Sequence, residues 1–278
     1  MTRVPSPHRK SFDRIAHCYD ATRAMPDAAH ADVTAGLMRT LRAVTLAPRL
    51  LEIGVGTGRI AVPLARSGID VVGVDVAPAM LAQLRARRPG LPVLIGEAAR
   101  PPFRRASFDA VLFVHLLHLV PDPAAVLEGA GELLRPRGVL LHGREERSAS
   151  PLRGVAAIVR SIVAELSHVE PPASLWNERA IEAFQAHARA HRRHTVQSVL
   201  ARWPERSTGR ALLDHIERRV WSSTWDIPDA IMPELIRRLT PRVEALVGGL
   251  DRPVEWESTF VLVSSAPRSP AGQATGVR

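Results

Sequence analysis

A glycine-rich segment carries the strongest chemical signal in the sequence. Residues 51–58 read LEIGVGTG and join a short apolar run, typical of a buried strand, to the start of a helical pattern. Glycine permits positive φ angles and lets the backbone approach a ligand closely. The first N–H groups of the following helix have no partner within that helix, so they can bind a polar ligand. The segment therefore predicts a ligand-binding turn.

A carboxylate follows the next apolar run. Asp75 ends the segment 71–75 and lies seventeen residues after Gly58. A carboxylate at this position can accept hydrogen bonds from both hydroxyl groups of a ribose, in dinucleotide enzymes as in others. The alternative is that Asp75 caps a helix that begins near Pro78. In a dinucleotide turn of spacing G-x-G-x-x-G, the third glycine would fall on Arg59, so a nicotinamide dehydrogenase is disfavoured.

The glycines at 54, 56 and 58, with an acidic residue two positions before the first, resemble motif I of the class I S-adenosylmethionine-dependent methyltransferases. Three later segments fit the same family in the same order: Asp75, then 96–99 (GEAA), then 114–122 (VHLLHLVPD). The last is similar to the methyltransferase type 11 group, which includes ubiquinone- and menaquinone-biosynthesis enzymes. Family members often carry Asp where this chain has Glu97. The resemblance covers roughly residues 11–146.

The resemblance implies S-adenosyl-L-methionine as cofactor, S-adenosyl-L-homocysteine as product, and no metal. Segments 12–16 and 19–23 look like the group's helical cap over the cofactor. Met80 is expected either to pack on the adenine or to belong to the core. An aromatic ring attracts a sulfonium cation, which is a role for Tyr19. The residues expected to contact the cofactor are Glu52, Gly54, Gly56, Thr57, Gly58, Asp75, Val76, Met80, Glu97, Ala98 and His115, with Tyr19 and Arg23 from the cap.

Two histidines, His115 and His118, follow the fourth apolar run, at the edge where open α/β sheets bind their ligands. Methyl transfer from a sulfonium is an in-line displacement, so the protein mainly positions and desolvates the reactants. A general base is needed only where the acceptor must lose a proton. The two histidines are the candidate bases, with His118 preferred. The alternative is that one packs against the cofactor and the other belongs to the core.

The elements that position these residues alternate along the chain. Apolar runs predict strands at 49–53, 70–74, 91–95, 108–115 and 139–142, and helical patterns fall at 58–67, 79–87 and after the cap pair Asp122-Pro123. Such alternation predicts an α/β, Rossmann-like and mostly parallel sheet with helices on both faces. Near the C-terminus, apolar residues alternate with polar ones from Val254 to Leu262. This period of two predicts a last, antiparallel strand at or near an edge.

We expect five regions. They are an arm and helical cap (1–47), a cofactor-binding core (48–147), a mainly helical acceptor-side region that includes a core strand near 194–201 (148–250), the final strand (251–265) and a flexible tail (266–278). Within the helical region, Ile231, Leu235 and Leu239 mark one helix that is expected to end near Pro241.

Composition narrows the functional classes. The single cysteine, Cys18, excludes a disulfide within the chain. The longest apolar run, 110–120, is too short to span a membrane, and residues 1–10 do not form a secretory signal, so a cytoplasmic location is expected. The net charge of +9 comes almost wholly from scattered arginines, because Lys10 is the only lysine. This pattern favours a solvated basic surface over a nucleic-acid footprint.

The sequence thus favours methyl transfer to a small molecule, without identifying that acceptor or the atom that is methylated. An RNA-modifying methyltransferase remains an alternative. So does a protein that binds S-adenosylmethionine or S-adenosylhomocysteine without catalysis. The sequence also leaves open whether the chain forms a homodimer.

Overall fold

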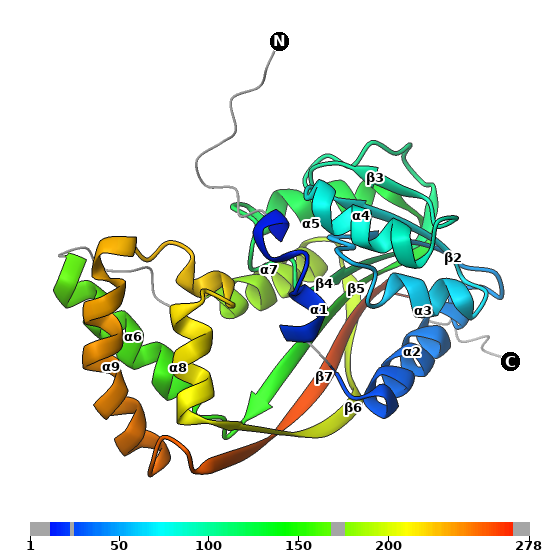
Figure 1. Ribbon diagram of the computed structural model, residues 1–278. Helices are drawn as coiled ribbons and strands as arrows, with labels where there is room; N and C mark the ends of the chain where they lie inside the picture. The colour runs from blue at the N-terminus through cyan, green and yellow to red at the C-terminus, as the bar shows by residue number, and fades with distance from the viewer. Residues whose placement is uncertain (1–11, 23–24, 168–175, 269–278) are drawn as a thin grey trace, which may run out of the picture. The chain divides into compact units, whose positions relative to one another are not determined.

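A seven-stranded sheet forms the centre of the protein. The computed structural model describes residues 12–22, 25–167 and 176–268 (Figure 1). Across these residues the strand order is β3-β2-β1-β4-β5-β7-β6. The strands are β1 (Arg49–Ile53), β2 (Asp70–Asp75), β3 (Val93–Ile95), β4 (Phe108–Val114), β5 (Leu134–Ser148), β6 (Arg193–Thr208) and β7 (Pro253–Pro267).

The sheet is mostly parallel. β1 pairs in parallel with β2 and β4, β2 pairs in parallel with β3, and β4 pairs in parallel with β5. β7 runs against β6, because Arg193 near the start of β6 bonds Ser265 near the end of β7, whereas Arg202 further along β6 pairs with Glu257. This arrangement confirms the predicted Rossmann-like sheet with its antiparallel last strand, which lies next to the edge strand β6.

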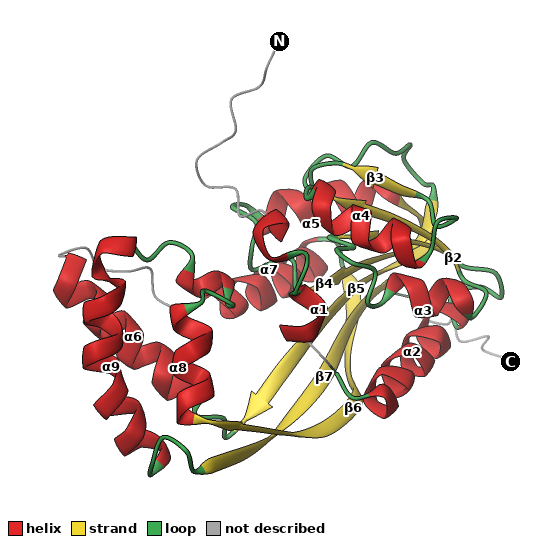
Figure 2. Cartoon of the chain, viewed as in Figure 1, coloured by secondary structure: helices red, strands yellow, loops and turns green. Residues whose placement is uncertain are grey.

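Helices cover both faces of this sheet (Figure 2). α5 and α7 pack on one face, and α2, α3 and α4 lie on the other; a 3-10 helix, η1, and the short α1 precede them in the chain. The bounds are η1 (Phe12–Ile15), α1 (Tyr19–Thr22), α2 (Asp27–Arg42), α3 (Ala61–Arg66), α4 (Pro78–Arg87), α5 (Pro123–Leu133) and α7 (Trp176–Ala190).

The core beneath α5 and α7 follows from helical spacing. On α7, the side chains of Ala180, Phe184 and Ala188 recur every four residues and are almost fully buried. Ala180 and Phe184 join apolar residues of the sheet and of α5 in one cluster that includes Val111 and Leu127. At the start of α5 the Asp122 side chain accepts a hydrogen bond from the Ala125 N–H at 3.0 Å, which confirms the predicted cap.

An irregularity at the start of β5 corrects one prediction. A strand was expected at 139–142, but β5 already begins at Leu134. The pairing with β4 shifts register there, so the extra residues form a bulge within the strand. The Asp109 carboxylate holds this region, since Arg135 donates to it at 2.6 Å and the Arg49 N–H at 2.9 Å.

The chain divides into two compact units. The first comprises Met1–Arg144, Trp176–Leu200 and Phe260–Arg278, and the second comprises Glu145–Leu175 and Ala201–Thr259, so the division falls within β5, β6 and β7. α7 groups with the first unit, although its residues lie in the region 148–250. The helices of the second unit are α6 (Leu152–Ser167), α8 (Gly209–Glu217), η2 (Ser222–Thr224), η3 (Asp229–Ile231) and α9 (Met232–Val247).

The second unit has its own apolar cluster. Leu235 and Leu239 of α9 are fully buried, and so is Val243 one turn further along the same helix. The helix therefore does not end near Pro241, as the sequence indicated, but continues to Val247. Burial of this continuous face outweighs the backbone hydrogen bond that proline cannot donate. Gly248, at φ 74°, then ends α9 in the left-handed conformation.

Several elements differ in extent from the sequence prediction. β5, β6 and β7 are each longer than the runs at 139–142, 194–201 and 254–262. The tail from 269 onward lies outside the described residues. Across the described parts of the chain, every helix is too short or too polar to cross a bilayer.

The packing of α7 on the sheet gives a test of the fold. Phe184→Ala leaves a cavity in the first unit's core, where Phe184 is 2% exposed. We expect the free energy of unfolding to fall by about 3–5 kcal/mol, measured by urea denaturation with far-ultraviolet circular dichroism. Leu46→Ala, at a residue that is 92% exposed, is the control and is expected to stay within about 0.5 kcal/mol of wild type. Equal effects of the two substitutions would contradict the packing.

Candidate functional site

The glycine turn lies at the carboxyl end of β1, and its backbone requires glycine. Gly54, Gly56 and Gly58 have φ angles of 77°, 55° and 82°. The turn is held against β2, because the N–H groups of Gly54 and Val55 donate to the Val74 carbonyl at 2.7 and 3.0 Å. A Cβ at Gly54 would stand 2.9 Å from the Leu116 side chain. Side chains at the three glycines would thus strain the backbone as well as crowd the turn.

The Asp75 carboxylate links this turn to α4. One oxygen, Oδ2, accepts a hydrogen bond from the Gly56 N–H at 2.8 Å, and Oδ1 accepts one from the Ala77 N–H at 2.9 Å. Burial raises the pKa of Asp75, while the N–H groups of Ala77, Gly56 and Val76 oppose that rise. The N-cap of α4 is Ala77, without a side-chain cap hydrogen bond, so Asp75 does not cap that helix as the alternative interpretation of the sequence expected. Both carboxylate oxygens keep lone pairs for a ligand.

Glu52 is a buried acid behind the turn. Its side chain is 2% exposed, and its Oε2 has no hydrogen-bond partner among the described residues. Burial first, and the negative charge of Asp75 second, raise the pKa of Glu52 from 4.5 to about 8, against the opposing effect of the Ala61 N–H. The group is therefore mainly protonated at neutral pH. A buried polar atom without a partner indicates a place for a ligand.

The N-terminal segment is tied to the glycine turn by polar contacts that the sequence did not predict. The Asp20 carboxylate accepts a hydrogen bond from Thr57 Oγ1 at 2.6 Å and another from the Arg87 guanidinium. Asp13 accepts one from the Ala79 N–H, near the start of α4, at 2.8 Å. η1 and α1 therefore lie over the turn and the start of α4, where the cap was expected (Figure 1).

Apolar contacts join the same parts. The rings of Phe12 and Tyr19 meet edge to face with centroids 5.6 Å apart, and both pack against a cluster that includes Ala16, Ala77 and Met80. Met80 is 3% exposed, so it belongs to the core between the cap and α4. Its methyl group also lies 3.2 Å from the point where a Cβ on Gly56 would stand. Arg23 lies outside the described residues.

The remaining predicted cofactor residues lie along the same edge. The Gly96 N–H donates to the Asp75 carbonyl at 2.9 Å, which brings the segment after β3 beside the end of β2. There Glu97 is exposed and Ala98 is half-buried, as is Val76 after β2. A cofactor contact of Glu97, Ala98 and Val76 stays a prediction.

Histidines gather at the ends of β4 and β5. His115 follows β4 with a φ of 51°, a strained value for a residue other than glycine, and its N–H donates to the Gly143 carbonyl at 3.3 Å. His142 of β5 pairs with Phe113 of β4 and is buried. Burial first, and then the neighbouring Arg144, His115 and His118, lower the pKa of His142 to about 3. His142 is therefore neutral at physiological pH.

His142 and Arg144 were not assigned to the site from the sequence. Arg144 is buried too, and its Nη2 donates to the side chain of Gln197 on β6 at 3.3 Å. The sequence did contain a signal for these two residues, because polar residues that follow the apolar run of a parallel strand fall at the ligand-binding edge of the sheet. From the sequence, His142 was taken as the last residue of its strand, and the segment 144–147 either faced the same cleft or formed a solvated charged loop.

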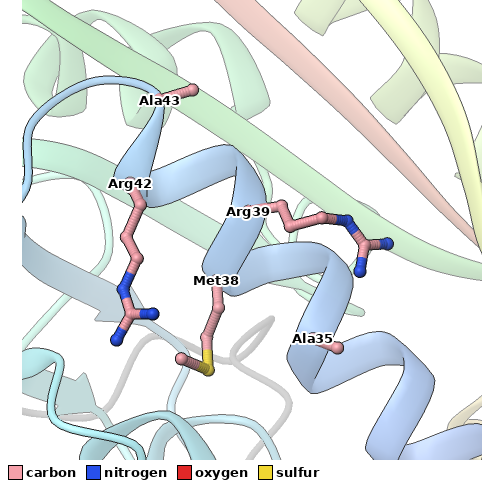
Figure 3. Close-up of a pocket in the computed structure, with 5 residues that line it drawn as sticks. All are labelled: Ala35, Met38, Arg39, Arg42 and Ala43. Atoms are coloured by element: carbon pink, nitrogen blue, oxygen red, sulfur yellow. The ribbon is translucent and has the colours of Figure 1, made fainter.

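A shallow pocket elsewhere belongs to a single helix. Figure 3 shows its lining on α2, where Met38 and Arg42 extend on the same side of the helix. The lining residues are Ala35, Met38, Arg39, Arg42 and Ala43. None of them was predicted to bind or to react, so this pocket is separate from the candidate site.

Comparison with known proteins gives a family for this arrangement. Residues 51–142 match a family described as a methyltransferase domain. A demethylmenaquinone methyltransferase of Renibacterium salmoninarum is 30% identical over 185 residues, which cover 62% of this chain and 75% of the relative. An uncharacterized methyltransferase of Mycobacterium tuberculosis is 40% identical over 104 residues, or 36% of this chain. The chain spans only 42% of the length of that mycobacterial relative.

A solved structure shares the fold. A putative methyltransferase from Bacillus halodurans superposes with a TM-score of 0.54 at 18% identity, over 84% of this chain and 99% of that one. The likeness extends the Rossmann-like architecture to most of the described chain.

Glu52 gives a test of the electrostatics. Between pH 4.5 and about 8 the unfolded chain releases the Glu52 proton while the folded chain keeps it, so this group lowers stability as the pH rises. Glu52→Gln removes that effect. We expect the stability of the variant relative to wild type to increase with pH, by up to about 1.4 kcal/mol per pH unit across this range.

The measurement is urea denaturation of both proteins at several values from pH 5 to pH 8. The control is Glu132→Gln, which removes an exposed carboxylate of α5. A constant difference between Glu52→Gln and wild type at all pH values would show that burial does not hold the Glu52 proton.

Proposed function

Because this chain belongs to the class I S-adenosylmethionine-dependent methyltransferases, we propose that it transfers a methyl group from S-adenosylmethionine to a small-molecule acceptor. One observation carries the proposal. The Asp75 carboxylate lies at the end of β2, bonded to the N–H of Gly56 in a turn of three glycines with positive φ. In this proposal the carboxylate accepts the ribose hydroxyls beside a backbone conformation that favours glycine.

The residues present fit the cofactor. Asp75 keeps lone pairs for the ribose hydroxyls, and the glycine turn leaves the adjoining space free of side chains. The unbonded Oε2 of Glu52 can accept a hydrogen bond or balance a positive charge. Val76, Glu97 and Ala98 are the proposed neighbours of the adenine. Met80 is part of the core that packs beneath this pocket, and it does not line the pocket's surface.

The cofactor supplies a methyl group that is already activated by the sulfonium charge, so the chain's own task is to orient and to desolvate. The cap contributes to both. Asp20 fastens α1 to Thr57 of the glycine turn, and Phe12 and Tyr19 add apolar cover over the start of α4. In this proposal the cap closes over the bound cofactor and keeps water from the reacting atoms. We also propose that Tyr19 and Arg23 meet the cofactor from this side.

His118 and His115 are the proposed bases where the acceptor must lose a proton. His142 is a poor base, because its pKa of about 3 keeps it neutral and weakly basic at physiological pH. It acts instead as a positioning residue. It fills the space between β5 and Phe184 of α7, whose ring centroid is 5.6 Å from its own, and it adds no positive charge beside the other two histidines.

The pairing of many arginines with carboxylates favours a small-molecule acceptor over a nucleic acid. Many of them are paired with carboxylates within the described residues, so their charge is partly neutralised. The pairs include Arg49–Asp70, Arg105–Glu132, Arg135–Asp109, Arg202–Glu257, Arg210–Asp251 and Arg219–Asp229. The name of the Renibacterium relative, a demethylmenaquinone methyltransferase, also points to a small organic acceptor.

The first experiment measures cofactor binding. We expect S-adenosylmethionine and S-adenosylhomocysteine to bind the full chain in calorimetry, and NAD not to bind. Asp75→Ala should weaken both adenosyl ligands at least about 100-fold, because two hydrogen bonds to a charged group are lost.

Asp70→Ala is the matched control, since Asp70 lies at the opposite end of the same strand and is exposed. It is expected to bind like wild type. Circular dichroism of both variants checks that they fold. If the wild-type chain binds neither adenosyl ligand, the proposed function fails. If it binds them but transfers no labelled methyl group to any acceptor in a small-molecule screen, a non-catalytic binding protein is favoured.

The cap gives a second binding test. Asp20→Ala removes the bonds to Thr57 and Arg87, so the cap should close less often and the affinity for S-adenosylhomocysteine should fall about tenfold. Asp27→Ala, which removes an exposed carboxylate at the start of α2, is the control. Equal affinities in wild type and Asp20→Ala would remove the cap from the cofactor site.

A further inference from the structure

Three potential metal ligands meet between α5 and α7. His191 Nε2 lies 2.8 Å from Glu128 Oε1, and His187 Nε2 lies 3.9 Å from the same oxygen. The two imidazole rings are 4.3 Å apart between centroids. One ligand atom from each residue can be chosen so that all lie within 4.8 Å of one another. None of these residues takes part in the site described above.

The backbone sets the two histidines on one face. The His191 N–H donates to the His187 carbonyl at 3.0 Å, so the helical turn of α7 continues to His191. Side chains four residues apart on a helix are neighbours, and this spacing lets two histidines bind one ion. Glu128 approaches from α5, which packs against α7 in the same core.

His187 has no hydrogen bond to explain its burial. Its side chain is 6% exposed, and neither Nδ1 nor Nε2 has a hydrogen-bond partner among the described residues. Such a group in a folded protein indicates a missing partner.

Gly131 lies beside the ring. Gly131 follows Glu128 by one turn on α5, and a Cβ there would stand 3.4 Å from His187 Nε2. Glycine therefore keeps a side chain away from the nitrogen. The positively charged guanidinium of Arg193 has other partners, because it donates hydrogen bonds to the Gly138 carbonyl and to Ser265.

We propose that Glu128, His187 and His191 form a binding site for a divalent transition-metal ion, with zinc as the best match. Two imidazole nitrogens and one carboxylate oxygen are a donor set that zinc accepts, and a water molecule completes its tetrahedral coordination. The exposed Glu128 and His191 side chains leave a path for the ion.

The proposed ion is structural rather than part of methyl transfer. Phe184 of α7 packs against His142 within β5, whereas Arg193, at the start of β6, bonds Gly138 nearer the amino end of β5. The ligands His187 and His191 lie between these points and lead away from the edge with the glycine turn. The ion would fasten α7 to α5, and the transfer step itself needs no metal.

Zinc titration of the full chain tests the proposal. The protein is purified without a histidine tag, treated with EDTA and dialysed, and then titrated with zinc chloride in a calorimeter and in a thermal unfolding assay. We expect one zinc ion per chain and a rise in the unfolding temperature. Glu128→Gln and His191→Ala, both at exposed side chains that folding does not require, should each weaken zinc binding at least about tenfold. Cobalt(II) should give the absorption of a tetrahedral site in wild type and lose it in both variants.

His194→Ala is the matched control, because His194 is an exposed histidine just beyond the cluster. It should bind zinc like wild type. Absence of zinc binding by the wild-type chain overturns the proposal, and so does binding of equal strength in wild type, Glu128→Gln and His191→Ala. Affinity for S-adenosylhomocysteine is expected to be the same with and without zinc, so this test stands apart from that of the proposed function.

Discussion

The two hydrogen bonds of the Asp75 carboxylate hold the candidate site together. Oδ2 fixes the Gly56 N–H in the turn after β1, and Oδ1 fixes the Ala77 N–H at the start of α4. Two segments from neighbouring βα units thereby share one acceptor. The cap depends on the same arrangement, because Asp13 bonds the Ala79 N–H of α4 and Asp20 bonds Thr57 of the turn. If the carboxylate moved, the turn and the surfaces to which the cap binds would move with it.

The sequence predicts the parts of this site that depend on local chemistry. Glycine at 54, 56 and 58 was interpretable because positive φ is a property of single residues, and the sheet followed from the alternation of apolar runs. Contacts distant in sequence were not predictable in this way. Asp20 meets Thr57 across 37 residues and Arg87 across 67, and nothing in the spacing selects those partners. Similarly, α9 passes Pro241 because Val243 and Val247 are buried in a cluster that only the fold assembles.

At the candidate site, burial shifts the pKa of a buried acid and the pKa of a buried base in opposite directions. Both side chains are therefore mainly neutral near pH 7. Burial raises the pKa of Glu52 to about 8 and lowers that of His142 to about 3. Near neutral pH, therefore, neither group carries much charge before a ligand binds. The two differ in what a cationic ligand does to them. A positive charge near Glu52 favours its ionised form, whereas one near His142 only strengthens its preference for the neutral form.

This difference fits methyl transfer from a sulfonium. Under the proposed function, the sulfonium cation leaves water for a buried site and needs a compensating negative charge, which an ionised Glu52 would provide. A protonated His142 would add a like charge to the same site. A neutral His142 would avoid that repulsion and leave His115 and His118 as the proposed bases. In this proposal the acid serves cofactor binding and the histidines serve proton transfer.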